Sequence, residues 1–555
     1  MAHTFSSEKR FAYVNELKTK ELDLLVIGGG ITGAGIALDG ASRGLKIGLI
    51  EMQDFAAGTS SRSTKLVHGG LRYLKQLEVK LVAEVGKERA IVYENAPHVT
   101  SPEWMLLPIF KNGTFGKFST SFGLNVYDRL ADVRKDERRH MLNKKTTLQR
   151  EPLLRKDKLK GGGLYVEYRT DDARLTLEIL KEAVRRGTVA VNYMKVESFL
   201  YENGKAVGVV MVDQFTGEAH KVFAKVIVNA AGPWVDTLRE QDRSKSGKQL
   251  KLSKGVHLVI DHARFPLSQA VYFDTEKDGR MIFAIPRDGK TYVGTTDTYY
   301  EADIAHPRMT IADRDYILEA ANFMFPSLHL TPEDVESNWT GLRPLIYEEG
   351  KSASEVSRKD EVFTSDSGLL SIAGGKLTGY RKMAERVVDD VCKKLSIKAV
   401  CQTDSITLSG GHVGGIDQFQ AFLEQQTREG VRLGLSENTA YGLSKLYGSN
   451  VTKVYACLRQ TKRHAEAFHL PKELLAQLRY GIEEEMVATP LDFFNRRTGA
   501  LFFNIQWVIE HKEAVLRYMK SVFEWSEEEA AMHEEELNRE IHFARTPVAD
   551  ENKPV

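Results

Sequence analysis

The sequence predicts an α/β protein with mixed strands, one parallel core and a helical C-terminal domain. A short apolar strand at residues 24–27 leads into a glycine-rich turn, a helix of small residues and a second strand, which is the pattern of a βαβ unit. Further strand-like segments recur up to residue 376, whereas amphipathic helical stretches and a Glu-rich tail follow residue 400. This change in pattern separates a helical domain from the α/β part.

Length and composition favour a soluble globular protein of two to four domains, because the 555 residues are 42% hydrophobic and 28% charged. A net charge of +1 gives no global argument for nucleic acid or for an acidic partner. The three cysteines exclude a disulfide scaffold and lack metal-ligand spacing, so we expect a reduced cytosolic compartment and no metal site. We find no secretion signal and no window near the roughly 18 apolar residues of a membrane-spanning helix. Any membrane contact is therefore expected at the surface.

The first motif is a glycine fingerprint in residues 22–35, LDLLVIGGGITGAG. Gly28 allows a sharp turn after the strand, Gly30 leaves room for a pyrophosphate at the helix N-terminus, and Gly33 lets the helix pack closely on the sheet. Glu51 ends the second strand, about 20 residues further on, where a ribose hydroxyl needs an acceptor. Together these features predict a bound dinucleotide.

Three later segments favour FAD over NAD as that dinucleotide. Residues 226–236 form a strand ending in Ala-Ala-Gly, where small residues allow close backbone approach to the cofactor. Residues 374–379 form a glycine turn before a helix whose N-terminus suits the pyrimidine edge of a reduced flavin. Residues 58–73 are rich in small and hydroxyl side chains, as a segment alongside an extended cofactor would be. The candidate cofactor contacts are Gly28, Gly30, Gly33, Glu51, Thr59, Ser60, Ser61, Ala231, Gly232, Gly375, Lys376, Leu377 and Thr378.

Several runs resemble the FAD-dependent glycerol-3-phosphate dehydrogenases, the quinone-linked enzymes of bacteria and mitochondria. These runs are GGGITGAG, GTSSRSTKLVHGGLRYL, SKGVH, GTTD, GLRPL and GGKLTGYRKMAE, and the resemblance covers residues 20–540. It implies an FAD-binding Rossmann-like domain of the glycine-oxidase/D-amino-acid-oxidase type, a mixed-sheet substrate domain and a helical C-terminal domain. We expect the FAD-binding domain at residues 20–99, 161–252 and 340–395, the substrate or cap domain at 100–160 and 253–339, and the helical domain at 400–545.

The substrate of such an enzyme carries a phosphate dianion and a secondary alcohol. Cations must hold the phosphate, preferably through a bidentate arginine. The resemblance implies that Arg72, Arg343 and Lys376 bind the phosphate or the developing alkoxide. Tyr73 is expected to add a further hydrogen-bond donor.

A second requirement is a base that takes the hydroxyl proton as hydride leaves the carbon. His68 is the first candidate and His257 the second, because a neutral imidazole has a suitable pKa. A histidine in a glycine-rich loop fits a structural role equally well, but His68 lies four residues from Arg72. Arg343 could also stabilise the alkoxide directly and reduce the need for a strong base.

Other polar residues are expected to have supporting roles. We expect Arg358 and Arg381 at solvated or helix-surface positions. The Thr-Thr-Asp run at 295–297 lies near the site according to the resemblance, although a turn with an Asx cap fits it equally well. Residues 480–497 resemble the C-terminal signature of the family, and we expect them to pack the helical domain on the flavin domain.

The resemblance implies that sn-glycerol 3-phosphate is oxidised to dihydroxyacetone phosphate, with hydride passing to FAD and electrons to membrane quinone. The apolar residues 104–122 and the basic residues 134–160 could meet an anionic bilayer. A substrate-domain hairpin and a solvated charged loop are the favoured alternatives for these segments. We expect a cytoplasmic protein without a nucleic-acid partner, and we leave open peripheral attachment to the inner face of the membrane and a homodimer.

The nearest alternative function is a glycerol-3-phosphate oxidase, which shares the flavin half-reaction but uses O2 and produces hydrogen peroxide. The choice of acceptor depends on access to the flavin, which residue spacing does not reveal. A catalytically silent FAD-binding protein would require a broken cationic pocket, yet Arg72, Arg343 and Lys376 are all present. An amino-acid or amine oxidase of the same fold would need one carboxylate-binding arginine and a more apolar pocket, so three cations favour the dianion.

Overall fold

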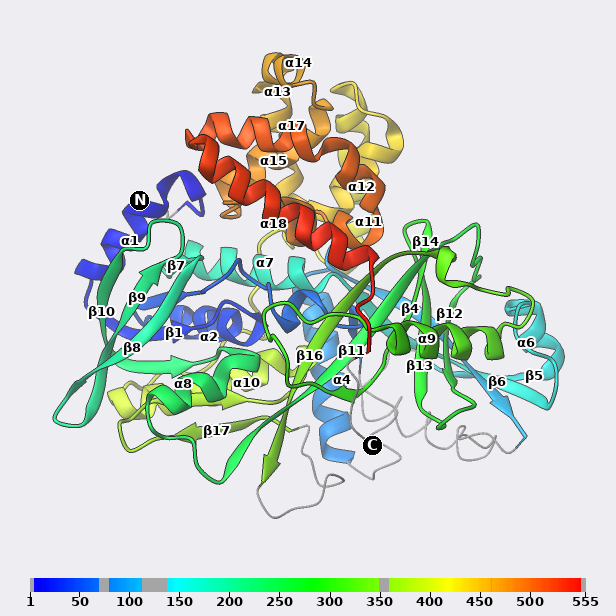
Figure 1. Cartoon of the computed structure of the whole chain (residues 1–555), viewed down its shortest axis with the longest axis horizontal. Coiled ribbons are helices and arrows are strands. Elements are labelled where there is room, and N and C mark those ends of the chain that lie inside the picture. Colours follow the sequence, from blue (N-terminus) through cyan, green and yellow to red (C-terminus); the bar gives the residue numbers. More distant parts are fainter. Residues whose placement is uncertain (1–3, 69–78, 112–136, 349–358, 461, 551–555) are drawn as a thin grey trace.

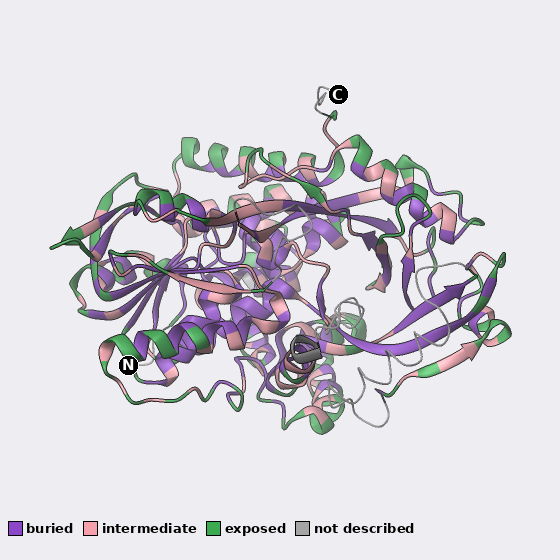
Figure 2. Cartoon of the chain, turned by 90° about the horizontal axis from the view of Figure 1, so that it is seen from below, coloured by how far each residue is buried: buried purple, intermediate pink, exposed green. Residues whose placement is uncertain are grey.

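Two sheets and a group of C-terminal helices make up the chain (Figure 1). The computed structural model describes residues 4–68, 79–111, 137–348, 359–460 and 462–550. The helices that follow residue 400 contact the second sheet and helix α7 (Asp172–Arg185), since Ser337 of the second sheet donates to Phe502 O and Arg174 of α7 pairs with Glu485. The interior of both sheets is buried, whereas the outer faces of the helices are exposed (Figure 2).

The first sheet carries the predicted βαβ unit. Within the described residues its strand order is β17-β18-β10-β1-β2-β7, and the β8–β9 hairpin is attached to β10. Strands β18, β10, β1, β2 and β7 are parallel, and β1 and β2 are almost wholly buried because α2, α7 and α10 cover the sheet. The strands are β1 (Leu22–Ile27), β2 (Ile47–Ile50), β7 (Val189–Val191), β8 (Met194–Glu202), β9 (Lys205–Asp213), β10 (Ala219–Asn229), β17 (Glu361–Thr364) and β18 (Leu370–Ala373).

The second sheet is mixed and mainly antiparallel. Its order over the described residues is β15-β11-β14-β13-β12-β4-β6-β3, with β16 paired to β11 and β5 to β6. The two longest partners, β11 and β16, pair from Lys248 opposite Glu348 to Ile260 opposite Val335. The strands are β3 (Leu66–Val67), β4 (Thr100–Phe110), β5 (His140–Asn143), β6 (Leu159–Thr170), β11 (Lys248–Asp261), β12 (Ala270–Asp274), β13 (Met281–Arg287), β14 (Lys290–Gly294), β15 (Thr298–Tyr299) and β16 (Val335–Glu348).

The helices and strands follow the predicted division of the chain, because every named strand of the described residues ends before residue 400 and only helices follow it. Helix α2 begins at Ile31, directly after Gly30, which serves as its N-cap. Helix α18 begins with a capping box between Ser526 and Glu529. The helices are α1 (Arg10–Thr19), α2 (Ile31–Ser42), α4 (Val79–Asn95), α6 (Lys144–Arg150), α7 (Asp172–Arg185), α8 (Val235–Gln241), α9 (Ile311–Met324), α10 (Tyr380–Leu395), α11 (Ile416–Arg432), α12 (Glu437–Tyr447), α13 (Val451–Gln460), α14 (Lys462–Phe468), α15 (Lys472–Glu484), α16 (Ala500–Phe503), α17 (Ile505–Phe523) and α18 (Glu527–Arg545).

The apolar segment considered for membrane contact contributes to the second sheet. Strand β4 pairs with β6 along its length and with β12, and Met105, Leu106 and Leu107 are buried. Residues 104–110 therefore belong to a strand of the second sheet, whereas residues 112–122 lie outside the described residues. In the part of the chain that the structure describes, no helix has the length and apolar character needed to cross a bilayer.

Candidate functional site

The first glycine turn brings three backbone segments into close contact. Gly28 has φ +113° and donates its N–H to Ile50 O at 2.8 Å, which closes β1 onto β2. A Cβ on Gly28 would lie 2.5 Å from Ala230 O, and a Cβ on Gly33 would lie 1.9 Å from Gly28 O. Glycine is therefore required at both positions for α2 and the end of β10 to approach the turn.

Glu51 and Ser60 lie at the same turn from the other side. Glu51 Oε2 accepts the Gly29 N–H at 2.7 Å, and its Oε1 accepts the Gln53 N–H at 2.9 Å. Burial raises the pKa of the Glu51 carboxyl, and these two N–H groups oppose the rise. Ser60 Oγ accepts the Ile31 N–H at 2.9 Å, at the N-terminus of α2. The helix N-terminus thus lies beside a carboxylate and a hydroxyl, a suitable arrangement for a nucleotide ribose and pyrophosphate.

The second glycine turn joins β18 to the 3-10 turn η7 (Leu377–Gly379) and α10. Gly374 and Gly375 have φ +76° and +80°, and a Cβ on Gly374 would lie 2.4 Å from Lys359 O. Thr378 Oγ1 accepts the His68 N–H at 3.2 Å, and the same hydroxyl donates to His68 O at 3.4 Å. These contacts bring two segments that are 310 residues apart to the same place.

One cavity of about 900 Å³ lies between the two glycine turns and the second sheet. Of the predicted site residues, the following line it: Gly28, Gly30, Glu51, Thr59, Ser60, His68, Ala231, Gly232, His257, Arg343, Gly375, Lys376, Leu377 and Thr378. The run 295–297 lines it as well. Gly33 and Ser61 are buried behind the lining, and Arg72, Tyr73 and Arg358 lie outside the described residues.

Both candidate bases are neutral imidazoles at physiological pH. Burial and the charge of Lys376 together lower the pKa of His68 to about 3. Burial also lowers the pKa of His257 well below its usual range, assisted by the charge of Arg343. His257 stacks on Trp339 with ring centroids 4.6 Å apart, and its Nε2 lies 3.1 Å from Thr64 Oγ1. Its ring is therefore held in place by two contacts.

Arg343 extends from β16 towards the run 295–297. Its Nη2 donates to Thr295 Oγ1 at 2.9 Å and its Nη1 to Thr296 O at 3.3 Å. Asp297 Oδ1 lies 3.4 Å from Nη1, and about a third of the Arg343 side chain stays exposed, where it lines the cavity. The run 295–297 thus orients the guanidinium.

Comparisons with known proteins identify this arrangement. A family model described as FAD dependent oxidoreductase matches residues 23–381, and one described as C-terminal domain of alpha-glycerophosphate oxidase matches residues 401–530. The aerobic glycerol-3-phosphate dehydrogenase of Bacillus subtilis (strain 168) is 61% identical over 553 residues, which cover 99% of this chain and 100% of that protein. The chain belongs to the FAD-dependent glycerol-3-phosphate dehydrogenase family.

Solved structures agree with this family and with the expected fold type. The glycerol-3-phosphate dehydrogenase from Bacillus halodurans, complexed with FAD, is 60% identical with a TM-score of 0.87, covering 99% of this chain and 100% of that one. A glycine oxidase from Bacillus cereus is 20% identical with a TM-score of 0.50, covering 68% of this chain and 99% of that one, and shares the fold alone. The predicted glycine-oxidase type of FAD-binding fold, with mixed sheets and a helical C-terminal region, is therefore confirmed.

FAD is the cofactor of this family member, as predicted, and the residues present fit it. A Cβ on Gly30 would meet the Ser60 side chain, with Oγ at 3.1 Å, and no other non-neighbouring residue within 4 Å, so the cavity side of the turn leaves room for a pyrophosphate. Glu51 would offer a carboxylate to the ribose, and the turn before α10 would offer backbone N–H groups at the far end.

Several cavity residues had no place in the sequence prediction. Three additional cations, Arg62, Lys195 and Arg280, line the cavity. Burial lowers the pKa of Arg62, whose Nη1 makes a long 3.4 Å bond to Ala305 O. Arg62 lies inside the GTSSRSTK run, so this run could have indicated it as a site residue. Lys195 lies in β8 and Arg280 directly before β13, and neither belongs to a motif.

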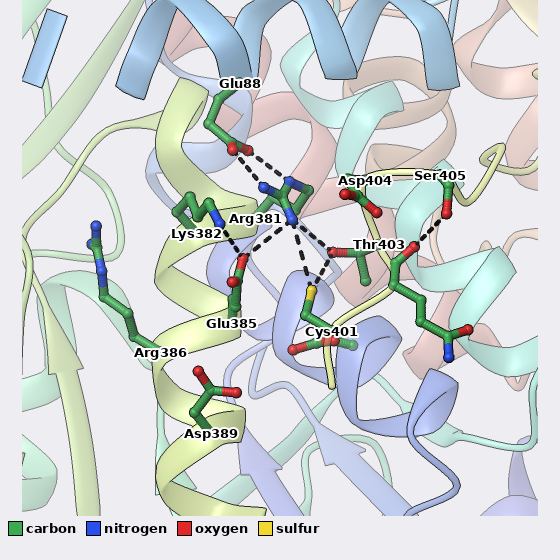
Figure 3. Close-up of polar contacts among 12 residues, drawn as sticks. Glu88, Arg381, Lys382, Glu385, Arg386, Asp389, Cys401, Thr403, Asp404 and Ser405 are labelled. Carbon is green, nitrogen blue, oxygen red and sulfur yellow. Dashed lines mark hydrogen bonds and ion pairs between the residues drawn. The ribbon is translucent and has the colours of Figure 1, made fainter. Parts of the chain in front are cut away.

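The expectation that Arg381 is solvated is wrong. Its side chain is buried, with Nε 2.8 Å and Nη2 2.5 Å from the two carboxylate oxygens of Glu88 on α4 (Figure 3). Nη1 contacts Glu385 Oε2 at 3.3 Å and Thr403 Oγ1 at 3.4 Å. The helical pattern of α10 showed its periodicity but not which helix would cover it, because Glu88 lies 293 residues earlier.

Proposed function

We propose that this chain oxidises sn-glycerol 3-phosphate to dihydroxyacetone phosphate and that its electrons pass to a membrane quinone. The observation that supports this best is the convergence of His68, Arg343 and Lys376 on the cavity that both glycine turns line. A dianion suits a site where the cations Arg343 and Lys376 lie beside a neutral base. Arg72 and Tyr73, outside the described residues, remain proposed contacts of the same phosphate.

The residues divide into a binding group and a proton acceptor. When bound, FAD accepts a hydride from the second carbon of the substrate. Arg343 and Lys376 bind the phosphate or stabilise the developing alkoxide, and Thr295 and Asp297 keep Arg343 oriented. His68 is neutral and takes the hydroxyl proton at an imidazole nitrogen, and the approach of the dianion raises its pKa from the low value of the free enzyme.

His68 is preferred to His257 as the base because of their surroundings. The ring of His257 is held by Trp339 and Thr64, whereas the hydrogen bonds of His68 to Thr378 involve only its backbone. Among described residues the His68 ring contacts Phe283 edge-on, with centroids 6.0 Å apart, which leaves its nitrogens for the substrate. His257 remains the second proposed base.

Anaerobic mixing tests the substrate. The holoenzyme is mixed with sn-glycerol 3-phosphate, and the absorbance of oxidised flavin is followed. We expect rapid bleaching in the wild type and slow bleaching in His68→Asn. Glycerol without phosphate is the control ligand, and bleaching that is absent with both compounds would reject the proposed substrate.

The electron acceptor and the membrane need separate measurements. With one substrate, reduction of a water-soluble quinone analogue should far exceed formation of hydrogen peroxide in air, whereas the reverse would establish the oxidase alternative. We also propose a cytoplasmic location with peripheral attachment to the membrane, for which sedimentation with anionic vesicles is the test. Light scattering of the purified holoenzyme decides between monomer and the proposed homodimer.

A further inference from the structure

A buried ionic cluster joins the loop after β2 to the helical C-terminal region. Asp54 is fully buried and accepts hydrogen bonds from Arg497 Nη1 at 2.6 Å and Nη2 at 2.9 Å. Arg496 Nε donates to it at 2.5 Å, and Asn192 Nδ2 at 3.1 Å. Both arginines lie on the π-helical turn η9 (Asp492–Arg497), so residues more than 440 positions apart share one carboxylate.

The loop that carries Asp54, residues 51–57, forms a wall at the ribose end of the cavity. Glu51 accepts the Gly29 N–H at 2.7 Å, and Ala56 donates its N–H to Gly29 O at 3.1 Å. The Phe55 ring lies 2.5 Å from the position of a Cβ on Gly29. The loop is therefore wedged against the first glycine turn on one side, and Asp54 tethers it on the other.

Arg497 is itself fixed by contacts on its far side. Its Nη2 and Nε donate to Glu485 O at 2.7 and 3.1 Å. Its carbonyl accepts a hydrogen bond from Arg174 Nη2 at 2.8 Å, and Arg174 also pairs with the Glu485 carboxylate. The guanidinium cannot follow Asp54 to another position without breaking these bonds.

The charges in this cluster make the tether specific. Burial alone would raise the pKa of Asp54, but the charges of Arg497 and Arg496 hold it at about 2. Arg496 also pairs with Asp492 Oδ1 at 2.7 Å, so it serves two carboxylates, whereas Arg497 gives both terminal nitrogens to Asp54. Loss of the Arg497 fork leaves a buried carboxylate incompletely paired, which favours movement of the loop towards water.

We propose that Arg497, from the helical C-terminal region, is a positioning residue for the adenosine end of FAD, holding Asp54 and thereby Glu51 in the conformation that binds the ribose. The proposal concerns retention of the cofactor and holds whichever substrate or electron acceptor the enzyme uses. By linkage, seating of η9 on the loop and binding of the nucleotide strengthen one another.

Nucleotide binding by the full-length apoprotein tests the proposal. Calorimetric titration gives the Kd for FAD and for ADP, which carries the ribose and pyrophosphate without the flavin. The variants are Arg497→Lys, which keeps the charge but loses the fork, and Asp54→Asn. The matched control is Asp313→Asn, because Asp313 is also buried and pairs with Lys254 Nζ at 2.5 Å, but it lies on α9 with Lys254 and Thr310 as its partners.

Arg497→Lys should weaken FAD and ADP by the same factor, about ten- to a hundredfold. Asp313→Asn should lower the melting temperature but leave both Kd values unchanged. If Arg497 had a merely structural role, Arg497→Lys would behave in the same way. Unchanged nucleotide affinity in Arg497→Lys would overturn the proposal. Weaker FAD binding with normal ADP binding would overturn it too, because the defect would then lie at the flavin end.

Hydrogen exchange of the wild-type protein tests the same proposal without a variant, and therefore applies even if Asp54→Asn does not fold. ADP binding should slow exchange of the backbone amides of residues 492–499, since the two sites are linked. Exchange in these amides that does not respond to ADP would contradict the proposal. The measurement uses no glycerol 3-phosphate, so its outcome is separate from that of the proposed reaction.

Discussion

Gly255 offers a steric test of the proposed phosphate site, because it lies on β11 beside Arg343 of β16. A Cβ on Gly255 would lie 2.4 Å from Arg343 Nη2 and 2.5 Å from Thr295 Oγ1, whereas ordinary contacts begin at 3.4 Å. In Gly255→Ala the guanidinium must therefore move by 3.4 − 2.4 = 1.0 Å. The atoms that must move are the ends of side chains, so the two strands can stay paired while the cation is displaced.

A displacement of this size at a substrate contact costs about a hundredfold in rate. This factor corresponds to about 2.7 kcal/mol of transition-state stabilisation. We therefore expect Gly255→Ala to lower kcat/KM for glycerol 3-phosphate by about ten- to a hundredfold, with the cation still present. The melting temperature should change little, because Gly255 has no left-handed φ that an alanine would strain.

Steady-state reduction of an artificial dye, together with FAD content and thermal melting, measures this effect. Gly442→Ala is the matched control, because a Cβ on Gly442 of α12 would meet no atom within 4 Å. Arg343→Lys should reproduce the loss of kcat/KM without the steric change. Wild-type kcat/KM in Gly255→Ala, with full FAD content, would refute the placement of Arg343 at the substrate.

Three further predictions concern the fold around the site. Gly33→Ala should abolish FAD binding and lower stability by at least about 1 to 3 kcal/mol, because its Cβ would lie 1.9 Å from Gly28 O, and FAD content with thermal melting checks this. Asp172→Asn should cost about 3 to 5 kcal/mol in urea unfolding, because it leaves the buried Lys65 ammonium, 2.6 Å away, without its counter-charge; a loss below about 1 kcal/mol would mean that water reaches this pair. Burial lowers the pKa of His533 to about 4. Between about pH 6.5 and 4 the unfolded chain therefore binds a proton at this residue that the folded chain does not bind, and the free energy of unfolding decreases as the pH is lowered through that window. In His533→Asn this decrease should be about 2 kcal/mol smaller at pH 5. The measurement is the free energy of unfolding in urea as a function of pH, and the same pH dependence in both proteins would contradict the assignment.

The two glycine turns were predictable because their steric constraints are local. The clash that excludes a side chain at Gly33 involves Gly28, five residues away, and Glu51 reaches back only to Gly29. Sequence spacing therefore records these contacts directly. The same holds for the glycine turn before α10, where two successive residues with positive φ require glycine.

The packing around the site depends on long-range ion pairs that no local sequence pattern indicates. Arg381 has the helical spacing of a surface residue, and its burial depends on Glu88 of a distant helix. Asp54 follows the predicted ribose acceptor by three residues, yet nothing near it in the sequence indicates the two arginines that hold it. Long-range ion pairs of this kind are decided by tertiary packing, and they were the main features that the sequence did not predict.

The pairing of β11 with β16 connects the two layers that enclose the cavity. The two strands run as one antiparallel ribbon from Leu250 and Ile346, which pack with the FAD-binding layer, to Val256 and Trp339 in the clusters of the second sheet. A large hinge motion between the two layers would strain this ladder of backbone hydrogen bonds. We therefore expect a cavity that is largely preformed, with most of the ordering cost of the site met during folding instead of at each turnover.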